Sequence, residues 1–301
     1  MPEIMTAALI ADAAQTGRPL SAFDVITLEH AEAIVQAAEK SSAPVILQVS
    51  RSTVSYHGGA LRPLAAALRA IAGAATVPVA LHLYLVNTAE LMRHGAAVGF
   101  SSIELDVHCL SYEERIAKVS RAARWLSANY VFAEAGLGPV HDWHTSSPDG
   151  NVANAAAQFA ADFVARTNID ALDVTVIDTA ERTIGVSPEV AIIPRLRKHV
   201  RVPLVLQLNS PMTNQDLQRS IRAGIVKIHV GSTSEMTFRG ARRRSLRSDR
   251  IVDPRFYLAS VRTALTERAS PSLNRSVAVT RRIRRPEGVN EGCERIRPAP
   301  R

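Results

Sequence analysis

Eight short apolar segments, most of them rich in β-branched residues, recur along this chain, and stretches with helical spacing of apolar residues separate most of them. The expected strands are residues 22–26, 44–50, 78–84, 101–107, 130–134, 171–177, 203–208 and 226–230. Strands buried on both faces of a parallel sheet read as continuous apolar runs, and PVILQV and PLVLQL have this character. Eight strands that alternate with helices predict a closed (β/α)8 barrel, the α/β fold known as the TIM barrel.

The expected helices between these strands are residues 28–40, 59–72, 89–97, 112–128, 152–166 and 214–223. An open doubly wound sheet is the alternative, but it would place a glycine-rich phosphate turn after its first strand, and AFDVITLEH has none. An added helix begins at the Asp253 N-cap, in DPRFYLASVRTALTER, and is expected to end near Arg268. The pattern therefore predicts a barrel over residues 1–268 and a disordered arginine-rich tail over residues 269–301.

The charge of the chain is concentrated near its C-terminus. The formal charge is +8, and residues 271–301 hold eight arginines and three glutamates, so this segment supplies +5. A second basic cluster lies at residues 239–250, with six arginines and one aspartate. Because the rest is close to neutral, we expect weak, nonspecific binding of polyanions by the tail rather than a dedicated nucleic-acid surface.

Composition also limits the cellular setting. A mean hydropathy of +0.02 with 21% charged residues is typical of globular proteins, and no apolar run reaches the roughly 18 to 20 residues of a membrane span. The N-terminus has an early acid and no basic region, and two cysteines cannot form a disulfide framework. We therefore expect a cytoplasmic protein without a membrane segment.

A series of segments in register resembles the class II, zinc-dependent ketose-bisphosphate (fructose-bisphosphate) aldolases from about Leu20 to Arg268. The segments are AFDVITLEHAEAIVQAAE, SAPVILQVS, PVALHL, GFSSIELDVHCLSYEER, EAGLG, FVARTNIDAL, VPLVLQLNS, AGIVKIHVGSTSE and DPRFYLASVRTAL. The resemblance implies the barrel fold, reversible aldol cleavage of a phosphorylated ketose in carbohydrate metabolism, and a zinc cofactor. It also implies a small phosphorylated or carbonyl substrate and a homo-oligomer.

The residues that carry the family's chemistry are replaced in this chain. The family's third strand ends in LHLDH, whose aspartate transfers a proton and whose last histidine binds zinc, and these two positions hold Tyr84 and Leu85. The other two zinc histidines match Glu181 and Gln207. Zinc needs three suitable protein ligands and an open fourth position. We therefore expect no zinc cofactor, and zinc-dependent activity that is lost or strongly altered.

Some substrate-holding positions of the family are retained. Ser50, Ser210 and Ser232 match hydroxyl residues that face substrate, and His229 stands where the family has a substrate-contacting asparagine. Hydroxyl and backbone N–H groups at such turns suit phosphate oxygens. Both retained phosphate binding and turns that keep only their shape are compatible with these residues.

Two acids also match the family, Asp106 after the fourth strand and Glu134 in the fifth, and they are the catalytic candidates. Their alternative role is structural, as hydrogen-bonded carboxylates at the barrel mouth. A rebuilt metal site from His108, Glu134, Glu181 and His229 is a further hypothesis, because all four are of ligand type and lie near strand ends. Two classes of function remain open: an aldolase-type enzyme with altered chemistry, and a non-catalytic barrel that binds a small molecule or a partner protein.

Overall fold

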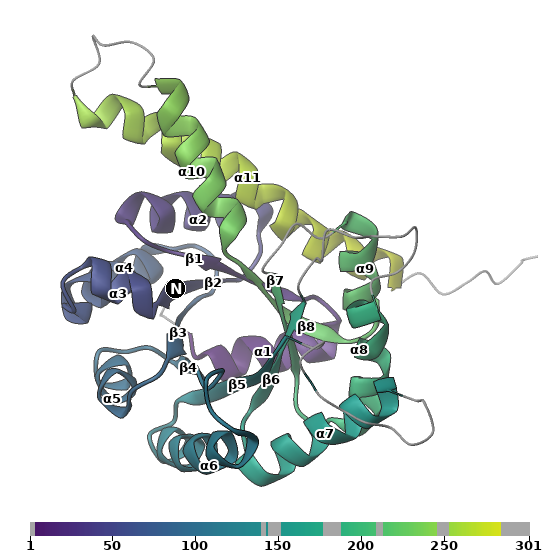
Figure 1. The fold of residues 1–301 in the computed structure, drawn as a ribbon. Helices are drawn as coiled ribbons and strands as arrows, with labels where there is room; N and C mark the ends of the chain where they lie inside the picture. The colour runs from purple at the N-terminus through teal and green to yellow at the C-terminus, as the bar shows by residue number, and fades with distance from the viewer. Residues whose placement is uncertain are drawn as a thin grey trace, which may run out of the picture.

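The computed structural model describes residues 4–139, 143, 152–176, 188–208, 213–245 and 253–283, and in it eight parallel strands form a closed barrel. The strands are β1 (Leu20–Asp24), β2 (Val45–Ser50), β3 (Val79–Val86), β4 (Ser102–Leu105), β5 (Phe132–Pro139), β6 (Ala171–Val176), β7 (Leu204–Leu208) and β8 (Ile225–Val230). Each strand pairs with its neighbour in sequence, and β8 closes the ring on β1 (Figure 1). The predicted (β/α)8 barrel is confirmed, with each expected strand in place and its ends moved by a few residues.

Helices surround this ring (Figure 1). They are α1 (Thr6–Thr16), α2 (Leu28–Ser41), α3 (Arg51–Tyr56), α4 (Leu61–Ala74), α5 (Ala89–Ala97), α6 (Tyr112–Ala128), α7 (Val152–Thr167), α8 (Pro188–His199), α9 (Asn214–Arg222), α10 (Ser232–Ser245) and α11 (Pro254–Ile283). Side chains cap several of them. The Thr88 hydroxyl accepts from the Leu91 amide at the start of α5, and Ser111 and Glu114 form a capping box on α6.

Helix α1 covers the N-terminal end of the barrel. Its buried residues Leu9, Ile10 and Ala13 pack on a group of inward-facing strand residues. These strand residues are Leu20, Ala22, Ile46 and Ala80. We call this group, together with the three α1 residues, the apolar layer. It closes one end of the barrel, and the opposite, C-terminal end of the strands is where the functional groups of such barrels gather.

Helix α11 corrects the expected boundary at Arg268, because the helix continues to Ile283. Its buried residues Val261, Leu265, Ala269 and Leu273 recur every four positions, so one face stays apolar past Arg268. This face packs against α2 and α10. Residues 269–283, assigned to the tail from sequence, are therefore helical, and residues 284–301 lie outside the described part of the chain.

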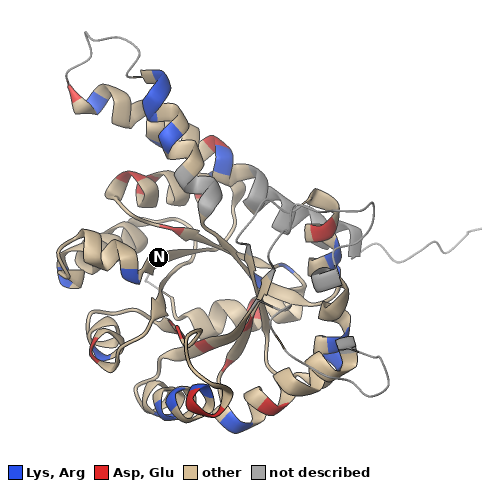
Figure 2. Ribbon diagram, in the orientation of Figure 1, with Lys and Arg blue, Asp and Glu red and all other residues tan. Residues whose placement is uncertain are grey.

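The outer surface carries most of the charge. Figure 2 shows most acidic and basic residues on the surrounding helices, with a few on the strands inside the ring. Within the described residues, no helix has the length and apolar character to cross a membrane. The charged residues inside the ring are therefore the ones that need a physical explanation.

Candidate functional site

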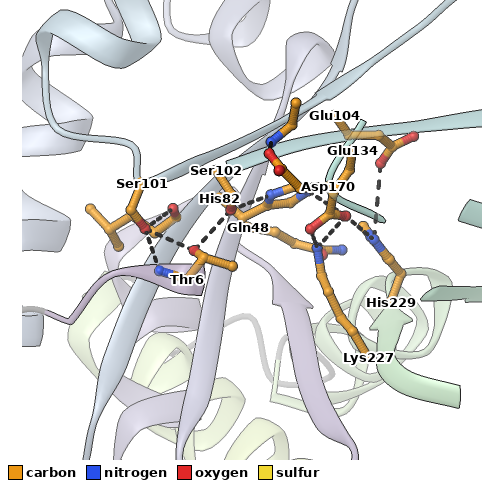
Figure 3. Close-up of polar contacts among 12 residues, drawn as sticks. Thr6, Gln48, His82, Ser101, Ser102, Glu104, Glu134, Asp170, Lys227 and His229 are labelled. Carbon is orange, nitrogen blue, oxygen red and sulfur yellow. Dashed lines mark hydrogen bonds and ion pairs between the residues drawn. The ribbon is translucent and has the colours of Figure 1, made fainter. Parts of the chain in front are cut away.

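Six buried ionisable side chains line the middle of the barrel interior, one step along the strands from the apolar layer, and Figure 3 labels all of them except Asp173. We call them the ionisable layer. Its members are His82 on β3, Glu104 on β4, Glu134 on β5, Asp173 on β6, and Lys227 and His229 on β8. Strand register brings them together, since Glu104 pairs directly with Glu134. Such groups are rarely buried unless they are paired or bind a ligand.

The centre of the ionisable layer is a buried ion pair between Glu134 and Lys227. The Lys227 ammonium donates to both carboxylate oxygens, at 2.8 Å to Oε1 and 2.7 Å to Oε2, and neither side chain is exposed. Burial alone would raise the pKa of Glu134, but the charge of Lys227 holds that pKa well below its usual range. Glu134 is therefore a carboxylate whose oxygens are already occupied.

Two histidines flank this pair without hydrogen-bonding to it. His82 Nε2 lies 3.8 Å and His229 Nε2 lies 3.7 Å from Glu134 Oε2, both too long for a hydrogen bond. Burial lowers the pKa of His82 well below its ordinary value and that of His229 to about 4, and Lys227 lowers both further. Both imidazoles are thus neutral near pH 7.

A directed chain of hydrogen bonds fixes the tautomer of His82 (Figure 3). The chain ends at the Leu81 carbonyl, which can only accept, from the Ser101 hydroxyl at 3.2 Å. The Thr6 hydroxyl lies 2.8 Å from Ser101 Oγ, and the Ser102 hydroxyl donates to Thr6 at 2.9 Å. Ser102 Oγ must then accept from His82 Nδ1, 2.7 Å away. The proton of neutral His82 sits on Nδ1, so Nε2 presents its lone pair to the ionisable layer.

Two further carboxyls complete the layer. Burial raises the pKa of Glu104 well above its ordinary value, and the neighbouring Asp173 raises it further. Burial likewise raises the pKa of Asp173 to about 7, with a contribution from Glu134. These two carboxyl groups interact with each other in a region that Lys227 alone cannot neutralise.

Nearer the C-terminal ends of the strands, Tyr84, Asp24 and Gln48 form a second polar group. The Tyr84 hydroxyl donates to Asp24 Oδ2 at 2.8 Å, and the Gln48 amide donates to Asp24 Oδ1. A Cβ atom at Gly231 would lie 2.7 Å from Asp24 Oδ2, so the glycine allows this carboxylate its place. Gly231, directly after β8, therefore leaves room for the Asp24 carboxylate.

The backbone at the end of β3 is irregular. Leu85 has φ of 57°, and the pairing of β3 with β4 shifts register between Leu83 and Val86. A left-handed conformation costs a non-glycine residue about 1 kcal/mol or more. The strained turn thus lies at the two positions where the resembled family has its proton-transfer and zinc residues, and here they are Tyr84 and Leu85.

Asp106 lies at the barrel mouth and is only partly buried. His108 Nδ1 is 2.8 Å from Asp106 Oδ1, and an Arg51 nitrogen lies 3.8 Å from Oδ2. Partial burial would raise the pKa of Asp106, but the hydrogen bonds from His108 and the charge of Arg51 hold it below its ordinary value. Asp106 is therefore an ionised, accessible carboxylate beside a cation.

The other residues expected from sequence fall in several places. The Ser50 hydroxyl is buried and caps α3 by accepting from the Thr53 amide at 3.0 Å. Ser232 is the first residue of α10, directly after β8, and Gln207 is on β7 beside β8. Ser210 and Glu181 lie outside the described residues.

The hypothetical metal site of four residues is divided by the fold. Glu134 and His229 lie in the ionisable layer, His108 is exposed at the mouth, and the fourth residue is outside the described part. The structure instead brings two other side chains to His229. The ligand atoms of His82, Glu104 and His229 all lie within 4.8 Å of one another.

The sequence reading does not select His82, Glu104, Asp173 or Lys227 as site residues. The signal that could identify them is one or two ionisable residues inside an otherwise mainly apolar strand, as in SIEL, ALDVTV and IVKIHV. Such a residue in a buried parallel strand must face a partner, because both faces of the sheet are covered.

Comparison with known proteins gives a consistent result. The family described as fructose-bisphosphate aldolase class-II matches residues 4–277. A fructose-bisphosphate aldolase of Staphylococcus aureus is 26% identical over 275 residues, covering 89% of this chain and 94% of the relative. The structure of the YdjI aldolase from Escherichia coli K12 has a TM-score of 0.75 at 24% identity, over 89% of this chain and 95% of that one. The fructose-bisphosphate aldolase of Campylobacter jejuni gives 0.72 at 20% identity, over 91% and 96%.

Proposed function

Because this chain belongs to the class-II fructose-bisphosphate aldolase family, we propose that it is an aldolase homologue whose zinc-dependent chemistry is lost or strongly altered. Family membership supports aldol cleavage as the ancestral reaction. The substrate class that we propose is a phosphorylated ketose or a related carbonyl compound. The observation that supports the proposal lies at the end of β3. There Tyr84 stands at the position of the family's proton-transfer aspartate, and its hydroxyl donates to Asp24.

The residues at the family's zinc positions do not fit the metal. Leu85 has no lone pair to donate, and the amide of Gln207 is a poor ligand for zinc compared with imidazole. No step of a reaction is therefore assigned to zinc at these positions. A retro-aldol reaction without this Lewis acid must stabilise the developing enolate by other groups.

Tyr84 cannot replace the proton-transfer carboxylate of the family directly. Its hydroxyl proton is held by Asp24 at 2.8 Å, so near pH 7 the phenol is a hydrogen-bond donor rather than a base. The Asp24 carboxylate accepts from both Tyr84 and Gln48. Of the two acids selected from sequence, Asp106 has the better access to a substrate, because Lys227 occupies both oxygens of Glu134.

The barrel mouth offers groups for an anionic substrate. Arg51 is 45% exposed and lies beside Asp106 at the start of α3, and Ser232 begins α10. We propose that Arg51 and Ser232, with Ser210, hold the phosphate. Ser50 would contribute less, because its hydroxyl already caps α3. His229 is buried in the ionisable layer, so it would act on a substrate only from the barrel interior, on the side away from the mouth.

Fructose 1,6-bisphosphate cleavage tests the altered chemistry. We expect turnover far below about 1 s⁻¹, the lower end of ordinary enzyme rates, with or without added zinc. A coupled assay of triose phosphate release measures it. Turnover at or above this rate would show that the family's chemistry is retained and that the site has been misassigned.

Thermal shifts test the substrate class separately. Phosphorylated ketoses should raise the Tm, the unphosphorylated sugars should not, and Arg51→Gln should reduce the shift. Arg124→Gln, on the exposed surface of α6, is the matched control. A shift without turnover would favour the non-catalytic binding barrel. No shift with any phosphorylated ketose would contradict the substrate class. A cytoplasmic location and a homo-oligomeric state stay predictions.

A further inference from the structure

We propose that His82, Glu104 and His229 form a binding site for one divalent transition-metal ion of the zinc type, within the barrel and at positions different from Leu85, Glu181 and Gln207. The three side chains come from β3, β4 and β8, and they are among the most deeply buried polar groups of the described chain. Their ligand atoms lie within 4.8 Å of one another. Figure 3 shows the three side chains near the Glu134 carboxylate.

The first argument is hydrogen bonding. His82 Nε2, Glu104 Oε2 and both ring nitrogens of His229 are buried without a partner among the described residues. Leaving such atoms unpaired costs about 1 to 3 kcal/mol each. An ion bound by all three residues would supply three of these four interactions at once, one at each residue, and one ring nitrogen of His229 would stay unpaired.

The second argument is the fixed orientation of His82. Ser102 Oγ accepts the Nδ1 proton, and the Thr6 and Ser101 hydroxyls continue the chain to a backbone carbonyl. Metal-binding histidines commonly donate their second ring nitrogen to an oxygen in this way, which sets the tautomer and aims the lone pair. The lone pair of Nε2 faces Glu134, another acceptor, rather than a donor. This position favours a cation.

The third argument is charge. Glu104, Glu134 and Asp173 contribute three negative charges when all are ionised, and Lys227 contributes one positive charge, so the fully ionised layer would have a net charge of −2. Two protons could neutralise it, and so could a single divalent ion. Protons would neutralise the charge without pairing the histidine nitrogens, whereas a divalent ion would neutralise the charge and also bind a nitrogen of each histidine.

Ligand type narrows the metal. Two imidazoles and one carboxylate suit zinc, iron(II) or cobalt(II) and do not suit magnesium or calcium, which prefer oxygen. Tetrahedral zinc with bonds near 2.1 Å places its ligand atoms about 3.4 Å apart. His229 Nε2 and Glu104 Oε2 are 4.0 Å apart, and all three ligand atoms lie within 4.8 Å of one another, so binding requires a contraction of up to about 1.4 Å. Glu134 stays in the outer shell because Lys227 holds both its oxygens.

This inference goes beyond the proposed function and departs from the expectation of no metal cofactor. That expectation rests on Leu85, Glu181 and Gln207 alone. Zinc at the new site does not imply that fructose 1,6-bisphosphate is cleaved, so the two proposals can fail independently.

Cobalt(II) is a suitable probe because its visible spectrum reports coordination. Chelator-treated protein should bind one Co²⁺ per chain with absorption typical of a four- or five-coordinate site, and zinc should displace it. Glu104→Gln and His229→Gln should weaken Co²⁺ binding at least about 100-fold, more than the loss of an outer-shell partner usually does. His199→Gln, which removes an exposed histidine at the end of α8, is the matched control and should bind normally.

A measurement on the unaltered chain removes dependence on the folding of the variants. In protein labelled with ¹⁵N at its nine histidines, one equivalent of zinc should shift the ring nitrogens of two of them. Lack of stoichiometric binding by the unaltered chain would overturn the proposal. Unchanged binding in folded Glu104→Gln and His229→Gln variants would also overturn it, as would shifts confined to exposed histidines.

Discussion

The apolar layer and the ionisable layer lie next to each other inside one barrel, yet they are stabilised in different ways. In the apolar layer, Leu9 and Ile10 of α1 pack on aliphatic strand residues that need only matching shape. In the ionisable layer, two residues further along β3 from Ala80, His82 faces charged groups whose burial is favourable only when each is paired. Both layers have the same strand geometry, so the side chains alone decide which layer can bind a ligand or take part in a reaction.

The comparison shows where this barrel tolerates change. The apolar layer loses packing when a side chain is shortened, and the loss is local. The ionisable layer is coupled, because Glu134 lies near Lys227, His82 and His229 at once. Removing one member therefore changes the environment of the others, and this is the layer that a ligand can stabilise.

The largest expected effect is that of Lys227→Met. It leaves Glu134 as a buried charge without its cation, and breaking a buried pair from one side costs about 3 to 5 kcal/mol. Urea denaturation of metal-free protein measures the change. The double variant Lys227→Met/Glu134→Leu should recover most of the lost stability, because apolar replacement of a whole pair is often neutral. A single variant as stable as the parent would show that the ionisable layer is not coupled as described.

A smaller loss is expected from Leu9→Ala in the apolar layer. Leu9 is 4% exposed, and shortening a buried leucine costs about 2 to 5 kcal/mol, with the lower half expected at the end of a barrel. The comparison is sharpened by a second measurement, since Co²⁺ affinity should stay within about threefold. A large change in Co²⁺ affinity would mean that the two layers are not independent.

A pH dependence of stability should come from His30 on α2, which lies outside both layers. Burial lowers the pKa of His30 to about 4 from 6.5, opposed by Glu29, and its ring stacks on Phe238 of α10. The folded state binds this proton less well than the unfolded state. The contribution of neutral His30 to the free energy of unfolding is therefore complete above pH 6.5. It is lost as pH falls toward 4, with a loss on the order of 2 kcal/mol by pH 5.

His30→Gln tests this assignment by thermal melts between pH 7 and pH 5. The variant should have a flatter profile than the parent, and the remaining slope belongs to the ionisable layer and other groups. An identical slope in both proteins would assign the whole pH effect elsewhere.

The smallest effect on stability is expected from deletion of residues 284–301. This segment contains five arginines and three glutamates and lies beyond the buried residues of α11. The Tm should change by less than about 2 °C, while salt-sensitive retention on heparin should fall. Retention that is unchanged would place the basic surface at residues 239–250. A deletion from residue 271, which removes the buried Leu273, should destabilise the chain and serves as the contrast.

The sequence predicted the barrel well because its signals are local. Apolar runs such as PVILQV and amphipathic stretches such as 112–128 reveal strands and helices within a few residues. The end of α11 is not predicted correctly from sequence, because a four-residue repeat through Ala269 and Leu273 is weak when one of its members is alanine. Helix α1 is not predicted either, since its buried face is short.

By itself, the sequence determined the order of the strands and of most helices, the family, and the presence of Leu85 and Gln207 at positions where the resemblance implies zinc ligands. Only the tertiary structure decided which inward residues meet. His82 and Glu104 come from the neighbouring strands β3 and β4, His229 comes from the distant strand β8, and closure of the ring brings their ligand atoms within 4.8 Å of one another. Burial and charge depend on everything that surrounds a group, so no spacing in the sequence reveals that these atoms lack partners.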